Sequence, residues 1–259
     1  MSFTQILLFR IPSFFLGFII VAFSIVLSIA GLLIVRRLIP HNRLKVHNDV
    51  ATAIFGTLGM AYTVLLAFVV VIVWQSFDRS SMNAEREANC LVDLYRDSEC
   101  FYEPVKKEVR ALVKEYAQSV VDEEWKVLAK GEESPHARDL INKLNGLYSG
   151  YIPSSKTDET FFRESVGKLN ELCELRRSRL FDSKTGIHPM LWFVLIIGGI
   201  ATIGFTLFFG SENLKAQMLM TVLLAALISL ILYTILMFDY PFTGDVRISS
   251  DAFREMFRY

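Results

Sequence analysis

The chain has 259 residues, of which 53% are hydrophobic and only 21% are charged, a composition typical of proteins that face lipid. Its 27 basic and 27 acidic side chains cancel, so the charge balance gives no indication of nucleic-acid binding. The charged residues are nearly absent from four long stretches and dense between the second and the third. This distribution predicts an integral membrane protein.

Each of the four stretches is long enough to cross the membrane, because about 30 Å of hydrocarbon takes roughly 20 apolar residues of helix. The expected spans run over residues 14–35, 50–74, 190–209 and 217–238. Arg36 and Arg37 mark the end of the first span, and Asp78 and Arg79 mark the end of the second. We therefore expect an all-α fold in which four transmembrane helices form two hairpins.

The segment between the hairpins has the helical spacing of apolar residues rather than the alternation of a strand. Helices are expected over residues 80–100, 104–131, 134–148 and 158–181. Ser134 followed by Pro135 is a typical helix start. The predicted organisation is an N-terminal region with the first hairpin, a helical extramembrane domain, the second hairpin and a C-terminal tail, over residues 1–77, 78–186, 187–238 and 239–259.

Small residues recur within the expected spans, where they allow helix backbones to approach closely without a hydrophobic driving force. They are Gly17, Ala30, Gly31, Gly56, Gly59, Gly198, Gly199 and Gly204. This pattern favours a packed bundle or an oligomer and does not distinguish the two.

No residue pattern indicates catalysis or a bound cofactor. The sequence has neither a phosphate-binding glycine loop nor a nucleophile elbow, and His41 and His47 are poorly spaced for a metal. The three cysteines, Cys90, Cys100 and Cys173, are expected to be free thiols. We therefore predict that the protein is not an enzyme and binds no metal or cofactor.

The acidic pairs of the middle segment, Glu123 with Glu124 and Glu132 with Glu133, are interpreted as parts of a solvated helix face. The spans themselves contain no carboxylate, lysine or arginine. Proton-coupled transporters usually place ionisable groups at mid-membrane, whereas a passive pore can select with apolar constrictions, backbone groups and hydroxyls. The spans therefore favour a passive pore over an active transporter.

Two motifs of the sequence resemble those of bestrophins. The stretch from Gly56 to Phe68, continuing through Trp74–Arg79, resembles their second transmembrane segment. A post-span motif made of Pro241, Phe242, Gly244 and Asp245 resembles their Pro-Phe-Gly-Asp segment after the fourth span. A fuller likeness, over nearly the whole chain, is to a mostly bacterial group called bestrophin-like membrane proteins. Its points in common are Leu65–Val70, Glu85–Asn89, Glu124-Trp125 and Pro241–Asp245.

Bestrophins are pentameric anion-selective channels, so the resemblance implies a homo-oligomeric channel, pentameric in its lipid bilayer, that passes inorganic anions such as chloride. Their narrow neck is lined by apolar residues one helical turn apart on the second span. Carried over to this sequence, the neck consists of Met60, Val64 and Phe68. These residues are four apart and so share one helix face. The alternative is that they pack against another span.

The sequence departs from the bestrophin pattern in two places. Ala67 stands where bestrophins have the glycine before the neck phenylalanine. Bestrophins that respond to calcium carry an acidic cluster after the Pro-Phe-Gly segment, whereas here Asp245 is followed by Val246 and Arg247. Because calcium needs six to eight oxygen ligands, no such site is expected.

Two features give opposite predictions for the orientation in the membrane. Arg36, Arg37, Arg43 and Lys45 make the first loop basic, and short basic loops tend to stay in the cytoplasm, which would put the middle segment outside. The bestrophin resemblance and the unpaired cysteines favour a cytoplasmic middle segment. We expect the latter, in a bacterial inner (plasma) membrane.

A second function fits the same sequence. The protein is then a non-conducting membrane scaffold or sensor, whose helical domain recruits a partner and whose spans only anchor it.

Overall fold

The computed structural model describes all residues except 1, 41–43, 46–47 and 259. Every regular element in the described part of the chain is helical. The chain divides into two compact units. The span unit comprises Arg10–Gln75 and Ile187–Asp239, and the helical unit comprises Met1–Phe9, Ser76–Gly186 and Tyr240–Tyr259. The expected N-terminal region and C-terminal tail thus group, for the most part, with the middle segment.

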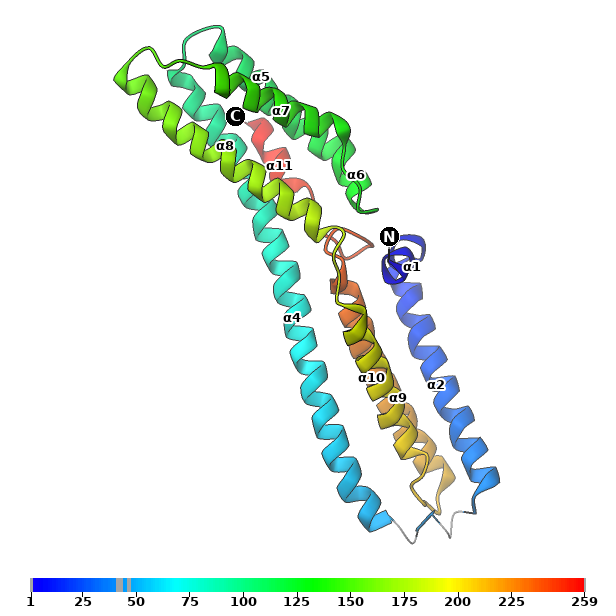
Figure 1. The fold of residues 1–259 in the computed structure, drawn as a ribbon. Helices are drawn as coiled ribbons and strands as arrows, with labels where there is room; N and C mark the ends of the chain where they lie inside the picture. Colours follow the sequence, from blue (N-terminus) through cyan, green and yellow to red (C-terminus); the bar gives the residue numbers. More distant parts are fainter. Residues whose placement is uncertain (1, 41–43, 46–47, 259) are drawn as a thin grey trace. The chain divides into compact units, whose positions relative to one another are not determined.

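The span unit is built from four helices that are long and apolar enough to cross a membrane. They are α2 (Ser13–Leu38), the first part of α4 (Asn48–Asp97), α9 (Pro189–Thr206) and α10 (Leu214–Asp239). Figure 1 shows these helices running lengthwise beside one another. The prediction of an all-α membrane protein with four spans is confirmed.

Glycines bring the spans together at several of the expected positions. A Cβ atom at Gly17 would lie 2.9 Å from the ring of Tyr233, whose hydroxyl donates a hydrogen bond to the carbonyl of Ser13 at 2.8 Å. A Cβ atom at Gly31 would lie 2.9 Å from Leu207. By contrast, a Cβ atom at Gly56 or Gly204 would meet nothing within 4 Å. The close approach expected of small residues therefore holds at some of these positions and not at others.

Helix α4 does not end at Asp78 and Arg79, the charged pair expected to mark the end of the second span. It continues as one helix through Asp78 and Arg79 to Asp97. The expected second span and the expected helix over 80–100 are therefore a single element. The charged pair marks the edge of the apolar stretch, and neither glycine nor proline follows it to stop the helix.

The helical unit contains the remaining elements. They are α1 (Phe3–Arg10), η1 (Ser98–Cys100), α5 (Val105–Ser119), the π-helical turn η2 (Val120–Glu124), α6 (Trp125–Leu128), α7 (Pro135–Gly150), α8 (Lys156–Asp182), α11 (Asp251–Glu255) and η3 (Met256–Arg258). The expected start at Ser134 is confirmed, because its hydroxyl accepts a hydrogen bond from the backbone N–H of Ala137 at 3.3 Å.

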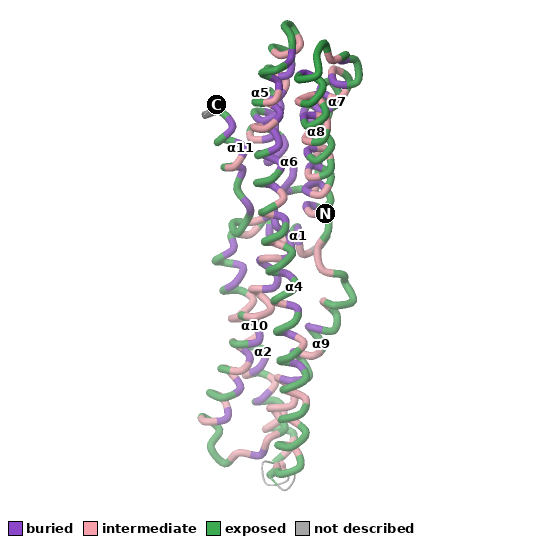
Figure 2. The backbone as a smooth tube through the Cα atoms, turned by 90° about the vertical axis from the view of Figure 1, so that its left-hand side faces the viewer, coloured by how far each residue is buried: buried purple, intermediate pink, exposed green. Residues whose placement is uncertain are grey.

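The core of the helical unit joins segments that are far apart in the sequence. Leu91 of α4, Val113 of α5 and Leu172 of α8 are fully buried in it. Figure 2 shows buried stretches alternating with exposed ones along α5 and α8. The C-terminal segment contributes Phe242 and Phe253, which are 2% and 0% exposed. The segment after α10 therefore contributes side chains to this core.

Candidate functional site

The span part of α4 has one face that packs against the other spans. Tyr62, Leu66, Val69 and Val73 are buried there and form a cluster with residues of α9 and α10 that includes Leu195. These α4 residues follow the three- and four-residue spacing of a helix face. This face fixes the rotation of α4 within the span unit.

Tyr62 holds that rotation in place. Its hydroxyl donates a hydrogen bond to the carbonyl of Leu195 at 2.8 Å. Its ring lies over Gly198, where a Cβ atom would come within 2.6 Å of the ring, and over Gly199. The glycine pair thus leaves the space that the tyrosine ring fills.

The three expected neck residues lie on a different face of α4, which faces away from the other spans. Met60 is 71% exposed, Val64 is 49% exposed and Phe68 is 64% exposed. In the described part of the chain, these three side chains are exposed rather than buried among the other spans. The structure leaves them as an unpartnered apolar row, which we call the neck row.

The surroundings of the neck row are also uncharged. No charged residue lies between Asp49 and Asp78. The hydroxyl of Thr57, one turn before Met60, donates a hydrogen bond to the carbonyl of Ala53 in its own helix. A species passing along this face would therefore meet apolar groups and hydroxyls rather than ionised side chains.

The post-span motif lies in the helical unit and is largely buried. Phe242 packs edge-on against Trp125, with ring centroids 5.7 Å apart. The carbonyl of Pro241 accepts a hydrogen bond from the N–H of Ile248 at 2.9 Å. Gly244 has a φ of +88°, a conformation that favours glycine. The motif forms a turn that holds the C-terminal segment in the core, and within it only Asp245 is exposed.

The search for a metal site covers only the described residues. In the described ranges no group of three histidine, cysteine, aspartate or glutamate side chains could hold a metal ion. His41 and His47 lie outside the described residues, as does Arg43 of the basic loop. Cys90, Cys100 and Cys173 are free cysteines.

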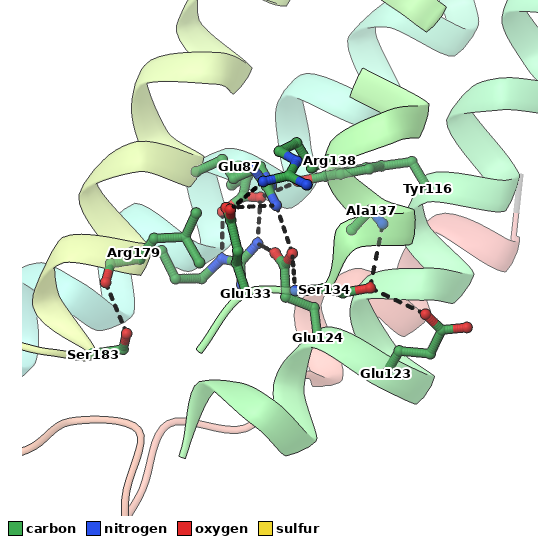
Figure 3. Close-up of polar contacts among 12 residues, drawn as sticks. Glu87, Tyr116, Glu123, Glu124, Glu133, Ser134, Ala137, Arg138, Arg179 and Ser183 are labelled. Atoms are coloured by element: carbon green, nitrogen blue, oxygen red, sulfur yellow. Dashed lines mark hydrogen bonds and ion pairs between the residues drawn. The ribbon is translucent and has the colours of Figure 1, made fainter. Parts of the chain in front are cut away.

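A buried ion-pair network is the main feature that the sequence did not indicate (Figure 3). Arg179 of α8 donates to both oxygens of Glu87 of α4, at 2.7 Å and 2.9 Å, and to Glu124 of η2 at 2.7 Å. Arg176 donates to the other oxygen of Glu124 at 2.6 Å. The hydroxyl of Tyr116 donates to Glu87 at 2.8 Å. The interpretation of Glu124 as part of a solvated face is therefore wrong, whereas Glu123 is exposed as expected.

The charges of this ion-pair network balance, and this is why they can be buried. Burial alone would raise the pKa of the Glu124 carboxyl, but Arg179 and Arg176 outweigh it and hold that pKa below its usual value. Burial would lower the pKa of Arg179, and the carboxylates of Glu87 and Glu124 raise it instead. The paired charges of this network indicate a structural role in joining α4, η2 and α8.

Comparison with known families decides which group the chain belongs to. The family described as Bestrophin-like domain matches residues 22–253. This chain belongs to the Bestrophin-like family. The match includes the whole neck row, the ion-pair network and the post-span motif. No curated protein matches this Bestrophin-like chain.

Solved structures show the same fold for this Bestrophin-like protein. One is a bacterial bestrophin homolog from Klebsiella pneumoniae carrying a mutation, with a TM-score of 0.72 and 12% identity, covering 92% of this chain and 96% of that chain. Another structure of a bacterial bestrophin homolog from Klebsiella pneumoniae has a TM-score of 0.66 and 13% identity over the same shares of the two chains. At this identity the likeness establishes the fold alone.

Proposed function

We propose that this Bestrophin-like protein is a homo-oligomeric, passive ion channel that conducts inorganic anions such as chloride. The neck row of Met60, Val64 and Phe68 forms the constriction, with one row contributed by each subunit. The observation that carries the proposal is the exposure of this apolar row on the face of α4 that its own span unit leaves uncovered. Pentameric assembly follows from the bestrophin resemblance.

The chemistry of the row supports a gate rather than a binding site. A ring of apolar side chains one turn apart excludes water when narrow and admits hydrated ions when it widens. No ionised group within the spans holds an ion or carries a proton. Conduction through such a neck is therefore passive and follows the electrochemical gradient.

We place the helical unit in the cytoplasm of a bacterial cell, with the spans in the inner membrane. The bestrophin resemblance supports this orientation, and the free cysteines of the helical unit are consistent with a reducing compartment. The basic residues before α4 argue for the opposite orientation, so the orientation needs its own test.

The function is tested by current recordings from purified protein in planar bilayers, with Phe68→Ala and a matched control. Phe68→Ala widens the neck and should raise the unitary current severalfold. Phe18→Ala is the control, because Phe18 is 68% exposed on α2 and lies outside the neck row; it should leave the current unchanged. If wild-type protein whose reconstitution is confirmed gives no steady current, the channel proposal is contradicted and the scaffold is favoured.

A further inference from the structure

A crevice lies within the span unit between α2 and α9, and residues of α10 complete it. Its volume is about 540 Å³, which falls within the roughly 300–1,000 Å³ typical of sites that hold one small ligand. Its walls are mainly apolar side chains, such as Phe23 of α2 and Ile200 and Ile203 of α9. The crevice therefore offers room for a ligand among helices that are apolar enough to cross a membrane.

The hydroxyl groups of the crevice leave little for a polar ligand to bind. Ser28 donates a hydrogen bond to the carbonyl of Ile25 at 2.8 Å, and Ser229 donates one to the carbonyl of Ala225 at 2.6 Å, each within its own helix. Ser24 adds one further hydroxyl, and no charged side chain is among the described residues that line the crevice. Because a buried polar group without a partner is costly, this chemistry favours a hydrocarbon chain.

The crevice is about as long as one leaflet of the membrane is deep. It extends from Ile20 to Gly31 along α2 and from Ile196 to Leu207 along α9. Each stretch is about 16 Å of helix at roughly 1.5 Å per residue. One leaflet provides about half of the roughly 30 Å of hydrocarbon, or about 15 Å. An extended acyl chain of a membrane lipid therefore matches the crevice in length as well as in chemistry.

Helices α2 and α9 meet at the end of the crevice that is nearer the basic loop. A Cβ atom at Gly31 would lie 2.9 Å from Leu207. Arg36 follows Gly31 by less than two helical turns and donates to the side chain of Gln217 at 3.1 Å and to the carbonyl of Ser211. Both acceptors are neutral, so the guanidinium group is held in place without a carboxylate.

This end of the span unit has an excess of positive charge. Its described charged residues are Arg36, Arg37, Lys45 and Lys215 against Asp49 and Glu212. Glu212 forms an ion pair with Lys45 at 2.6 Å. Arg37 and Lys215 are exposed, and neither forms an ion pair with another described residue. Two cationic side chains are thus available to an anionic group at the surface of the membrane.

We infer that the crevice binds one acyl chain of an anionic phospholipid, whose phosphate is held by the basic residues at the loop end, Arg37 and Lys215 among them. The apolar walls accept the acyl chain, and the positive end of the span unit favours an acidic headgroup over a zwitterionic one. The lipid covers apolar surface of α2 and α9 that the chain itself leaves open. The inference is independent of the proposed channel, because it holds whether or not the protein conducts ions.

The direct test uses wild-type protein in nanodiscs with a phosphatidylglycerol whose acyl chain carries a photoreactive diazirine. Illumination should attach the lipid to residues of the crevice, which peptide mass spectrometry locates on α2 and α9. Unlabelled phosphatidylglycerol should compete severalfold more effectively than phosphatidylcholine. Labels spread evenly over the exposed apolar faces of the spans, or equal competition by the two lipids, would overturn the inference.

Two substitutions test the crevice and the charge separately. Gly204→Leu fills the crevice, since Gly204 lines it and a Cβ atom there meets nothing within 4 Å, and should reduce labelling severalfold. Ala201→Leu is the matched control on the same helix, because Ala201 is exposed and does not line the crevice. Arg37→Gln should remove the advantage of phosphatidylglycerol, whereas Arg10→Gln, which removes an exposed arginine just before α2, should keep it.

A second copy of the chain is the alternative occupant of the crevice. In that case Gly204→Leu would lower the number of subunits measured by native mass spectrometry, and the wild-type crevice would take up no label. That result overturns the lipid site, as does an equal loss of labelling in Gly204→Leu and Ala201→Leu. The wild-type labelling pattern decides between lipid and protein even if Gly204→Leu does not fold.

Discussion

Glu124 stabilises the helical unit because each of its carboxylate oxygens accepts a hydrogen bond from a buried arginine. Glu124→Gln keeps the shape of the side chain but removes the negative charge that faces Arg176 and Arg179. Removing one partner from a buried ion pair costs about 3–5 kcal/mol. We expect a clear fall in the thermal unfolding midpoint of the purified protein in detergent.

Glu132→Gln is the matched control for this change. Glu132 is exposed and lies near the same network in sequence, so its replacement should alter the free energy of unfolding by no more than about 0.5 kcal/mol. Equal unfolding midpoints for the two variants would show that the network contributes nothing to stability.

The same carboxyl predicts a dependence of stability on pH. The pKa of Glu124 in the folded protein is held below its ordinary value of 4.5. A group with a lowered folded pKa contributes stability that is present above the unfolded pKa and is lost as the pH falls through the folded pKa. Acidification below about 4.5 should therefore lower the unfolding midpoint more steeply in the wild type than in Glu124→Gln. Parallel curves for the two proteins would contradict the assignment.

The sequence could not indicate this network, because its members are far apart along the chain and none of them belongs to a recognisable motif. Arg176 and Arg179 follow Glu124 by 52 and 55 residues. Glu124 stands beside Glu123, and two adjacent acids are typical of a solvated face. Only the packing of α8 against η2 and α4 distinguishes the buried member of the pair from the exposed one.

The contact of α4 with α9 depends on the absence of a side chain at Gly198. The Tyr62 ring cannot move aside freely, because its hydroxyl is bonded to Leu195. Gly198→Ala would place a Cβ atom 2.6 Å from that ring. Overpacking of this kind typically costs about 1–3 kcal/mol, so we expect a lower thermal unfolding midpoint in detergent.

Gly204→Ala makes the same chemical change on the same helix without a clash, since a Cβ atom there meets nothing within 4 Å. It should be neutral or stabilising by up to about 1 kcal/mol, because alanine is the better helix former. If Gly198→Ala is tolerated as well as Gly204→Ala, the close approach of α4 and α9 is not the constraint described above.

At the level of elements, hydropathy predicts the spans, but it does not tell which face of a span is buried. An uninterrupted apolar run such as 14–35 needs no tertiary information to be read as a transmembrane helix. In α4, however, both the buried row with Leu66 and the exposed neck row with Phe68 are apolar, so hydropathy does not separate them. The packing of Tyr62 against α9 sets the rotation of α4 and leaves Met60, Val64 and Phe68 exposed.

The orientation of the whole protein is open to measurement through Cys100, which is exposed on the helical unit. With that unit in the cytoplasm, a membrane-impermeant maleimide should leave Cys100 unlabelled in intact cells and label it after permeabilisation. Cys100→Ser should remove most of the signal, since Cys90 is buried and Cys173 is only partly exposed. Labelling of Cys100 in intact cells would contradict the cytoplasmic placement of the helical unit and indicate the opposite orientation.

The central claim is that several copies of the chain share one permeation path along their α4 helices. Its most direct test is the number of subunits in the purified protein, measured by native mass spectrometry from detergent or nanodiscs. The account predicts one closed assembly, a pentamer, in which the neck rows of Met60, Val64 and Phe68 face a common axis. A monomer or a dimer would contradict it, because neither can enclose a path lined by one exposed row per chain.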